Sequence, residues 1–365
     1  MPIDLLLLNL RKCSEQPRMK EALKTIAKIL LPIAIGIGVF VWLFSGEFSI
    51  DIFKQINFDS RLIIALVFAI IFVVGRDWGM CWRFVTLTDR TLSWQRSLKV
   101  TMLCEFTSTI TPTSVGGGAL SMIFLNREGI NWGRATTITM ITLFLDELFF
   151  VITCPIVILL FTDDALFGFT TSEFSQGLKL TFWIIYIAIT IWTALLYFGI
   201  IAKPHAVKNI LMKIFSWRPL SRWRKSMKEM SDNMLSTSIE IKTRSKKWWG
   251  KAFAATAISW LSRYLLVNAL FWGLYPAADQ LIVLARQFIV WAILMVSPTP
   301  GGSGVSEYLF TEYYGDMITG GVMVMILALL WRVLSYYIYL LIGTFMMPSF
   351  LAAKKIEKQT KNNKL

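Results

Sequence analysis

Two stretches rich in glycine and proline interrupt long apolar runs of this sequence. Residues 111–118 read TPTSVGGG, and residues 297–304 read SPTPGGSG. Proline removes a helical hydrogen bond and consecutive glycines favour non-helical backbone, so each stretch predicts a break between two helices. The arm after each break holds about 10 residues, or about 15 Å of helix, which is half of a bilayer. We therefore expect two re-entrant helical hairpins, over 98–126 and 281–314, whose tips lie within protein or line a polar cavity.

The composition is typical of a protein embedded in a membrane. Of the 365 residues, 55% are hydrophobic and 16% are charged, whereas soluble domains carry about 25% charged residues. The 15 tryptophans fit side chains at membrane interfaces. The net charge of +14 arises from basic residues between the apolar runs, which is the pattern of an oriented membrane protein and not of a nucleic-acid-binding one.

Six apolar runs are long enough to span a bilayer of about 30 Å. They cover residues 29–45, 58–80, 135–161, 179–201, 252–275 and 317–342. Together with the two hairpins they predict an all-α polytopic membrane protein of about six transmembrane helices.

Lysine and arginine concentrate on one side of this layout. The segments predicted to be cytoplasmic hold 31 of the 37 basic residues; they are 1–28, 76–99, 126–134, 203–251 and 353–365. This bias predicts a multi-pass protein of the cytoplasmic membrane with both chain ends in the cytoplasm. It also requires the first broken run to re-enter, because a full crossing would place the basic segment 203–251 outside.

The order helix, helix, hairpin, helix occurs twice, and the two hairpins enter from opposite sides. This order predicts an inverted repeat, an architecture of secondary transporters whose substrate site lies where the repeats meet. The expected parts are an N-terminal cytoplasmic segment 1–28, a first repeat 29–161, an external loop 162–178, a second repeat 179–345 with a basic cytoplasmic linker 203–251, and a basic cytoplasmic tail 346–365.

Three motifs in order carry a resemblance to a known family. They read TPTSVGGGALSMIFLNREGINWGRA at 111–135, SPTPGGSGVSEYLF at 297–310 and ALLWRVLSYYIYLLIG at 328–343. Over about residues 60–345 the chain resembles the lysylphosphatidylglycerol synthase transmembrane-region family of flippase-like proteins, without the soluble aminoacyltransferase domain of larger members. The resemblance implies translocation of aminoacylated phospholipids or other lipid-linked molecules. The residues that match its motifs are Pro112, Gly117, Pro298, Gly301, Gly302, Gly304, Glu307 and Arg332.

The hairpin tips are the first candidate substrate site. A helical arm that starts near Gly118 or Val305 presents unpaired N–H groups and the positive end of its dipole, which suit a phosphate. The tip residues considered are Thr113, Ser114, Gly117, Gly118, Thr299, Gly301, Gly302 and Ser303. The alternative is that these residues only form tight turns and cap helices.

Ionisable residues within the apolar runs are the second candidate site. They are Glu105, Asp146, Glu147, Arg263, Arg286 and Arg332. Each costs about 3 kcal/mol or more at the centre of a membrane helix, so each should face a partner or a water-filled cavity. Two interpretations stay open. The charges form structural ion pairs, or the arginines neutralise a lipid phosphate while the carboxylates hold those arginines or bind a coupling proton.

Position along the chain suggests more specific roles for five charges. Arg332 and Asp146 each follow their repeat's proline by 34 residues, so we expect them to be coupled across the repeat interface. Glu307 is expected nearer the outer surface, as part of an exit gate. Arg76 and Asp77 are expected to mark the cytoplasmic interface.

Residues 208–230 mix apolar and basic side chains. They predict one or two surface helices on anionic lipid headgroups, or else a plain basic loop.

Other chemistries find no support in the sequence. The lone histidine, His205, and the four cysteines, Cys13, Cys81, Cys104 and Cys154, show no spacing of a metal or disulfide framework. The stretch VGGGAL lacks the lysine and hydroxyl residue of a nucleotide-phosphate loop. We therefore expect no catalytic residue, no metal and no cofactor.

The leading hypothesis is a flippase for a phospholipid or a polyprenyl-phosphate-type lipid, and not an enzyme. The expected partners are membrane lipids, anionic or phosphate-bearing, with no nucleic acid and with homo-oligomers possible. Two alternatives stay open, which are a membrane-embedded lipid-modifying enzyme and a non-catalytic scaffold of an envelope lipid pathway.

Overall fold

The computed structural model describes residues 58–111, 115–168, 173–217, 222–318, 321–347 and 350, all of them within one compact unit, 47–365. Several expectations lie outside the described residues. These are the N-terminal segment 1–28, the first apolar run 29–45, the tip residues Pro112 to Ser114 and nearly all of the tail 346–365.

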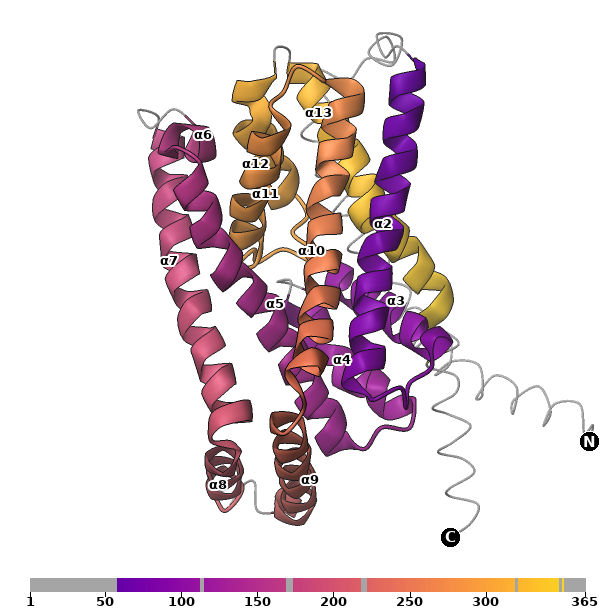
Figure 1. The fold of residues 1–365 in the computed structure, drawn as a ribbon, viewed down its shortest axis with the longest axis vertical. Coiled ribbons are helices and arrows are strands. Elements are labelled where there is room, and N and C mark those ends of the chain that lie inside the picture. Colours follow the sequence, from indigo (N-terminus) through magenta and orange to yellow (C-terminus); the bar gives the residue numbers. More distant parts are fainter. Residues whose placement is uncertain are drawn as a thin grey trace, which may run out of the picture. The chain divides into compact units, whose positions relative to one another are not determined.

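The described chain is helical, which confirms the predicted all-α class (Figure 1). Its α-helices are α2 (Ser60–Leu87), α3 (Trp94–Ile110), α4 (Val115–Arg127), α5 (Trp132–Leu160), α6 (Asp163–Phe167), α7 (Glu173–Leu196), α8 (Pro204–Ile214), α9 (Arg224–Lys242), α10 (Lys246–Leu274), α11 (Gln280–Leu294), α12 (Val305–Tyr314) and α13 (Gly321–Arg332). A π-helix, η2 (Tyr197–Ala202), extends α7, and another, η5 (Val333–Tyr337), extends α13; a 3-10 turn, η4 (Gly315–Met317), follows α12.

Four helices in the described part of the chain are long and apolar enough to cross a membrane. They are Ser60–Leu87, Trp132–Leu160, Glu173–Ala202 and Met323–Met347. They coincide with the predicted runs 58–80, 135–161, 179–201 and 317–342. The predicted run 252–275 falls in α10, a helix of 29 residues. Large apolar side chains on α2 and α7, such as Ile70 and Ile184, point away from the core, as a lipid-facing surface requires.

Local sequence explains where several helices begin. Asp59 accepts a hydrogen bond from the backbone N–H of Leu62 at 2.8 Å, and Asn131 accepts one from Arg134 at 2.8 Å. These side chains satisfy backbone donors that would otherwise lack a partner at the first turn of α2 and α5.

Both predicted breaks exist, and each separates two helices. α3 ends at Ile110 and α4 begins at Val115, whereas α11 ends at Leu294 and α12 begins at Val305. The second break is a glycine turn, because Gly301, Gly302 and Gly304 all have positive φ angles.

The first break differs from the expectation that its second arm starts near Gly118. α4 begins three residues earlier, so Gly117 is helical. A Cβ atom at Gly117 would lie 2.7 Å from the backbone nitrogen of Ser108. Glycine is needed there because α3 and α4 approach closely, and not because the chain turns.

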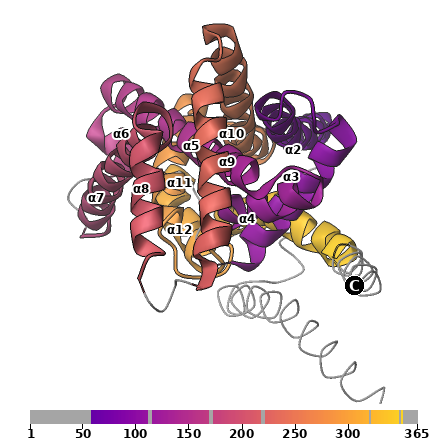
Figure 2. The same cartoon turned by 90° about the horizontal axis from the view of Figure 1, so that it is seen from below.

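The segment predicted as surface helices, 208–230, covers most of α8 and the first turns of α9. Figure 2 shows the two helices side by side, and the residues of one contact those of the other. Ile210, Ile214, Trp217 and Trp223 are exposed there. The alternative of a plain basic loop is therefore wrong, while contact with anionic lipid stays a prediction.

α2 and α10 pack closely at Gly79, which leads to a prediction. A Cβ atom there would lie 2.8 Å from Ala255 O and 2.8 Å from Ser259 N, both backbone atoms of α10. Gly79→Ala is therefore expected to lower the free energy of unfolding by about 1 to 3 kcal/mol, as overpacking does. Titration of the purified protein with a denaturing detergent measures this change. Gly177→Ala is the control, because a Cβ in that position of α7 meets nothing within 4 Å. Equal stability of the two variants would contradict the prediction.

Candidate functional site

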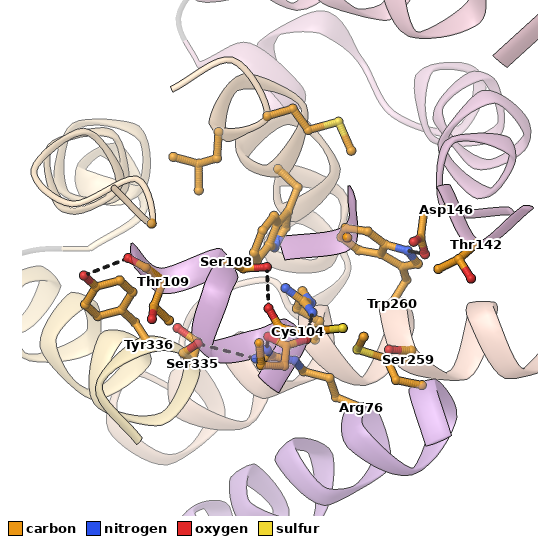
Figure 3. Close-up of a pocket in the computed structure, with 18 of the residues that line it drawn as sticks. Arg76, Cys104, Ser108, Thr109, Thr142, Asp146, Ser259, Trp260, Ser335 and Tyr336 are labelled. Carbon is orange, nitrogen blue, oxygen red and sulfur yellow. Dashed lines mark hydrogen bonds and ion pairs between the residues drawn. The ribbon is translucent and has the colours of Figure 1, made fainter. Parts of the chain in front are cut away.

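A cavity of about 150 Å³ lies where the helices of the two broken segments meet α2, α5, α10 and α13 (Figure 3). Polar and charged side chains line much of it. They are Arg76, Arg83, Glu105, Ser108, Thr109, Ser121, Thr142, Asp146, Glu147, Ser259, Arg263, Arg332 and Ser335. The cavity therefore gathers most of the ionisable residues that the sequence placed in apolar runs.

Glu105 bridges two arginines at one wall of the cavity. Its carboxylate forms an ion pair with Arg76 through Oε2 and with Arg263 through Oε1, the latter at 3.1 Å. The Arg76 guanidinium also lies over the ring of Tyr339, at 4.3 Å from the ring centre. Arg76 and Glu105 are buried. One carboxylate thus compensates two guanidinium groups contributed by α2 and α10.

Asp146 on α5 is held by α2 and α10. Arg83 Nη1 donates to Asp146 Oδ1 at 2.5 Å, and Trp260 Nε1 donates to the same oxygen at 2.8 Å. Arg83 also donates to Thr256 Oγ1 at 3.2 Å. Trp260 lies next to Asp146 in Figure 3. This ion pair links three long helices around the cavity.

Arg332 is bound to the second broken segment. Its Nε donates to Glu307 Oε1 at 2.8 Å, and its terminal nitrogens donate to Gly301 O and Ser303 Oγ, both at 3.2 Å. The guanidinium lies over the ring of Tyr336, at 4.0 Å from the ring centre. Arg332 therefore fixes the loop before α12 onto α13.

The expected pairing of Arg332 with Asp146 is wrong. Both residues line the cavity, but Arg332 pairs with Glu307 and Asp146 pairs with Arg83. Equal offsets along the chain do not fix the rotation of each helix about its axis, and that rotation decides which side chains meet.

The positional expectations for Glu307 and Arg76 stay predictions. Glu307 is buried and pairs with Arg332. Arg76 is buried and pairs with Glu105. Its neighbour Asp77 accepts hydrogen bonds from the Tyr339 hydroxyl at 2.9 Å.

Arg286 lies away from the cavity and has a different role. It donates to both carboxylate oxygens of Asp316, at 2.5 and 2.7 Å, and to the backbone oxygens of Tyr313 and Ala165. These contacts tie α11 to the end of α12 and to α6. The donors of Arg286 already form hydrogen bonds to protein acceptors, and Arg286 does not line the cavity. The expectation that Arg286 binds substrate is therefore not supported.

The two broken segments contact each other at the cavity. The Gly301 N–H donates to Thr111 O at 3.1 Å, and the Tyr336 hydroxyl donates to Thr109 O at 3.4 Å. Gly118, Gly301 and Gly302 line the cavity. The structure therefore brings these tip residues together with the charged residues in one site.

The other predicted tip residues have varied positions. Ser303 binds Arg332, and the Thr299 hydroxyl lies 3.1 Å from the Ser297 hydroxyl. Gly117 packs between α3 and α4 as described above. Thr113 and Ser114 lie outside the described residues.

The start of α12 is not open to a phosphate in the way the sequence suggested. Glu307 Oε2 accepts a hydrogen bond from the Gly304 N–H at 2.7 Å and another from the Ser306 hydroxyl at 2.8 Å. The helix therefore binds a carboxylate of its own first turn, which is a capping arrangement. The anion-binding capacity of the site must come from elsewhere.

Several residues that line the cavity have polar atoms without a hydrogen-bond partner in the described part of the chain. Seven cavity-lining residues each have a buried polar atom with no hydrogen-bond partner among the described residues. The atoms are Arg76 Nε, Arg83 Nε, Arg263 Nε, Trp291 Nε1, Trp331 Nε1, Thr142 Oγ1 and Glu147 Oε2. Five of these seven are N–H donors. Since buried donors are normally satisfied, their concentration here indicates a site for a hydrogen-bond acceptor.

Sequence reasoning missed four residues of this site. Arg76 and Arg83 were assigned to a cytoplasmic segment, and Trp291 and Trp331 were not considered. The arginines carried a usable signal, because residues seven apart lie on one face of a helix. The tryptophans carried none, since indole rings occur both in cores and at membrane interfaces.

Comparison with known proteins identifies the family of this chain. The model of the family described as Lysylphosphatidylglycerol synthase TM region matches residues 29–343. A UPF0104 membrane protein of Archaeoglobus fulgidus is 25% identical over 338 residues, which cover 90% of this chain and 98% of the relative. No solved structure matches the chain. The match extends over most of the sequence and includes both broken segments, so this integral membrane protein belongs to the family of the lysylphosphatidylglycerol synthase TM region.

Proposed function

We propose that this protein is a flippase that moves a phospholipid or a polyprenyl-phosphate-type lipid across the cytoplasmic membrane. One observation carries the proposal, which is that five residues lining a cavity between apolar helices each have a buried N–H donor without a partner among the described residues. Phosphate oxygens are strong acceptors that match guanidinium donors in geometry and charge. A phosphate-bearing headgroup is therefore the ligand that these donors fit best.

The size of the cavity supports a headgroup in preference to a whole lipid. A cavity of about 150 Å³ holds a group about the size of a benzene molecule. Two acyl chains do not fit in such a space. In the proposed mechanism the headgroup passes through the cavity while the chains stay among the lipids around the apolar helices.

The charge arrangement gives the headgroup a way to bind without leaving charges uncompensated. Arg76 and Arg263 share the single carboxylate of Glu105. A phosphate that binds their free Nε–H groups adds negative charge where two cations have one counter-ion. The buried positive charges are then better compensated than in the empty site.

The architecture that we propose for this mechanism has six spans, two re-entrant hairpins and an inverted repeat, with both termini in the cytoplasm. The hydrogen bond from the Gly301 N–H to Thr111 O supports it, because it joins the two broken segments. Transporters of this kind hold substrate where discontinuous helices of two repeats come together.

Cysteine labelling from each side of the membrane tests the proposed architecture, since Gly129→Cys and Gly315→Cys should react from opposite sides.

A reconstitution assay tests the function. The purified protein is reconstituted into vesicles that contain a fluorescent phosphatidylglycerol. A membrane-impermeant quencher, added outside, removes the fluorescence of lipid in the outer leaflet only. The rate at which the remaining fluorescence is lost therefore measures translocation. Arg263→Gln is expected to slow translocation about 10- to 100-fold, since a hydrogen bond to a charged group contributes about 1.5 to 3 kcal/mol. Arg96→Gln, an exposed arginine on α3, is the control and should translocate normally. Equal rates for the two variants would contradict the proposed role of the cavity.

Two further measurements separate the alternatives. Conversion of the lipid to a new species in detergent, detected by mass spectrometry, would show a lipid-modifying enzyme in place of a flippase. A scaffold would show no translocation of phosphatidylglycerol or of a polyprenyl phosphate, and its cellular role would persist in the Arg263→Gln variant. Mass spectrometry of copurified lipids identifies the substrate directly.

A further inference from the structure

Glu147 differs from the other carboxylates of the cavity. It lies on α5, lines the cavity and is 6% exposed. Its Oε2 atom has no hydrogen-bond partner, and no arginine or lysine of the described residues forms an ion pair with it. It is therefore a buried carboxylate without a compensating cation.

The arginines around it are already paired. Arg83 binds Asp146, Arg332 binds Glu307, and Arg76 and Arg263 bind Glu105. The other titratable side chains that line the cavity come from six elements. They are Arg76 and Arg83 of α2, Cys104 and Glu105 of α3, Asp146 of α5, Arg263 of α10, Arg332 of α13 and Tyr336 of η5. The lining residues of α4 and α11, such as Ser121 and Trp291, are not titratable.

A proton is the simplest compensation for such a group. An ionised carboxylate in a membrane interior is strongly disfavoured without a counter-charge, whereas its protonated form carries no charge and needs only ordinary hydrogen bonds. Among the described residues, none of the ion pairs of the cavity arginines includes Glu147. We propose that Glu147 binds the proton that couples to headgroup binding, so that the flippase takes up a proton together with its anionic lipid. This inference rests on the proposed function.

The direction of the coupling follows from the charges. A phosphate at Arg76 and Arg263 brings a negative charge into the cavity that Glu147 lines, and this charge favours the neutral form of the carboxyl. Reciprocity then requires that a proton on Glu147 tightens binding of the anionic headgroup. Affinity for an anionic lipid is therefore expected to rise as the pH falls, by a factor of about 5 to 150, the usual range of such coupling.

Proton uptake during lipid binding tests the inference. The purified protein in weakly buffered detergent with a pH-sensitive dye is titrated with short-chain phosphatidylglycerol. At a pH high enough to ionise Glu147 in the empty protein, the native protein should take up close to one proton per bound lipid, and Glu147→Gln, which is isosteric and permanently neutral, should take up about none. Glu312→Gln is the matched control, because Glu312 is exposed on α12 and should leave the uptake unchanged.

A second measurement does not require the lipid. Infrared difference spectra between high and low pH report the carbonyl stretch of a protonated carboxyl group. The band of a buried carboxyl should be present in the native protein, shift in Glu147→Asp and be absent in Glu147→Gln. An identical band in native protein and Glu147→Gln would overturn the inference, even if the glutamine variant bound no lipid.

The outcomes distinguish failure of the proton coupling from failure of the proposed flippase function. Translocation of phosphatidylglycerol without proton uptake, at equal rates in native protein and Glu147→Gln, would refute the coupling and leave the flippase proposal standing. Absence of both lipid binding and translocation in the native protein would refute the proposed function, and the coupling with it. Translocation that accelerates at lower pH in the native protein, and is independent of pH in Glu147→Gln, supports both.

Discussion

Glu105→Gln is expected to lower the free energy of unfolding by about 3 to 5 kcal/mol, as does removal of one partner of a buried ion pair. Glutamine keeps the shape of the side chain but leaves Arg76 and Arg263 without their shared counter-ion. Denaturing-detergent titration of the purified protein measures the loss. A change below about 1 kcal/mol would mean that water screens these arginines as it does at a protein surface.

A double variant identifies the cause of the loss. Glu105→Gln with Arg263→Gln removes one positive charge together with the negative one, so the cavity keeps its original net charge. It should be more stable than Glu105→Gln alone if the uncompensated charge is responsible. If the lost hydrogen bonds are responsible, the double variant should be less stable than either single variant. Such a cycle is informative because the two residues are in direct contact.

Arg332→Ala is expected to have the second large effect, on both stability and translocation. The substitution leaves the buried Glu307 carboxylate without its counter-ion. It also removes the hydrogen bonds to Gly301 and Ser303 that hold the loop before α12. The loss of stability should again be about 3 to 5 kcal/mol. Arg332→Lys should recover part of it, because lysine restores the charge but not the planar set of donors.

Translocation separates a structural role of Arg332 from a direct one. Arg332→Ala with Glu307→Ala leaves no uncompensated charge and should fold better than Arg332→Ala alone. The fluorescent-lipid assay should still find it slow, because the loop before α12 is no longer fixed at the cavity. Full translocation in the folded double variant would show that the pair only stabilises the fold.

Much of the fold followed from the sequence because its signals are local. Glycine and proline at 111–118 and 297–304 break helices wherever they occur, and apolar runs of sufficient length form long helices. The helix α2 still exceeded its expected end at residue 80. Its last turns contain Arg83, which a single sequence marks as polar but the fold compensates with Asp146.

The pairing of charges could not be predicted, because it depends on how helices far apart in the chain are rotated. Glu105 meets Arg263 across 158 residues and Arg83 meets Asp146 across 63. The sequence identified Glu105, Asp146 and Arg263 as buried charges but offered no means of choosing their partners. It also gave no indication that Glu147 would lack an ion-pair partner among the described residues.

The hydrogen bond from Gly301 to Thr111 has a consequence for biosynthesis. Thr111, which accepts this hydrogen bond, leaves the ribosome 190 residues before Gly301, which donates it. At about 5 to 20 residues per second, this delay lasts about 10 to 40 s. In the proposed re-entrant architecture, the first hairpin has no second hairpin to contact during that time, and an irregular backbone cannot remain exposed to lipid. The insertion machinery or water must therefore shelter the nascent hairpin until the second half of the chain has been made.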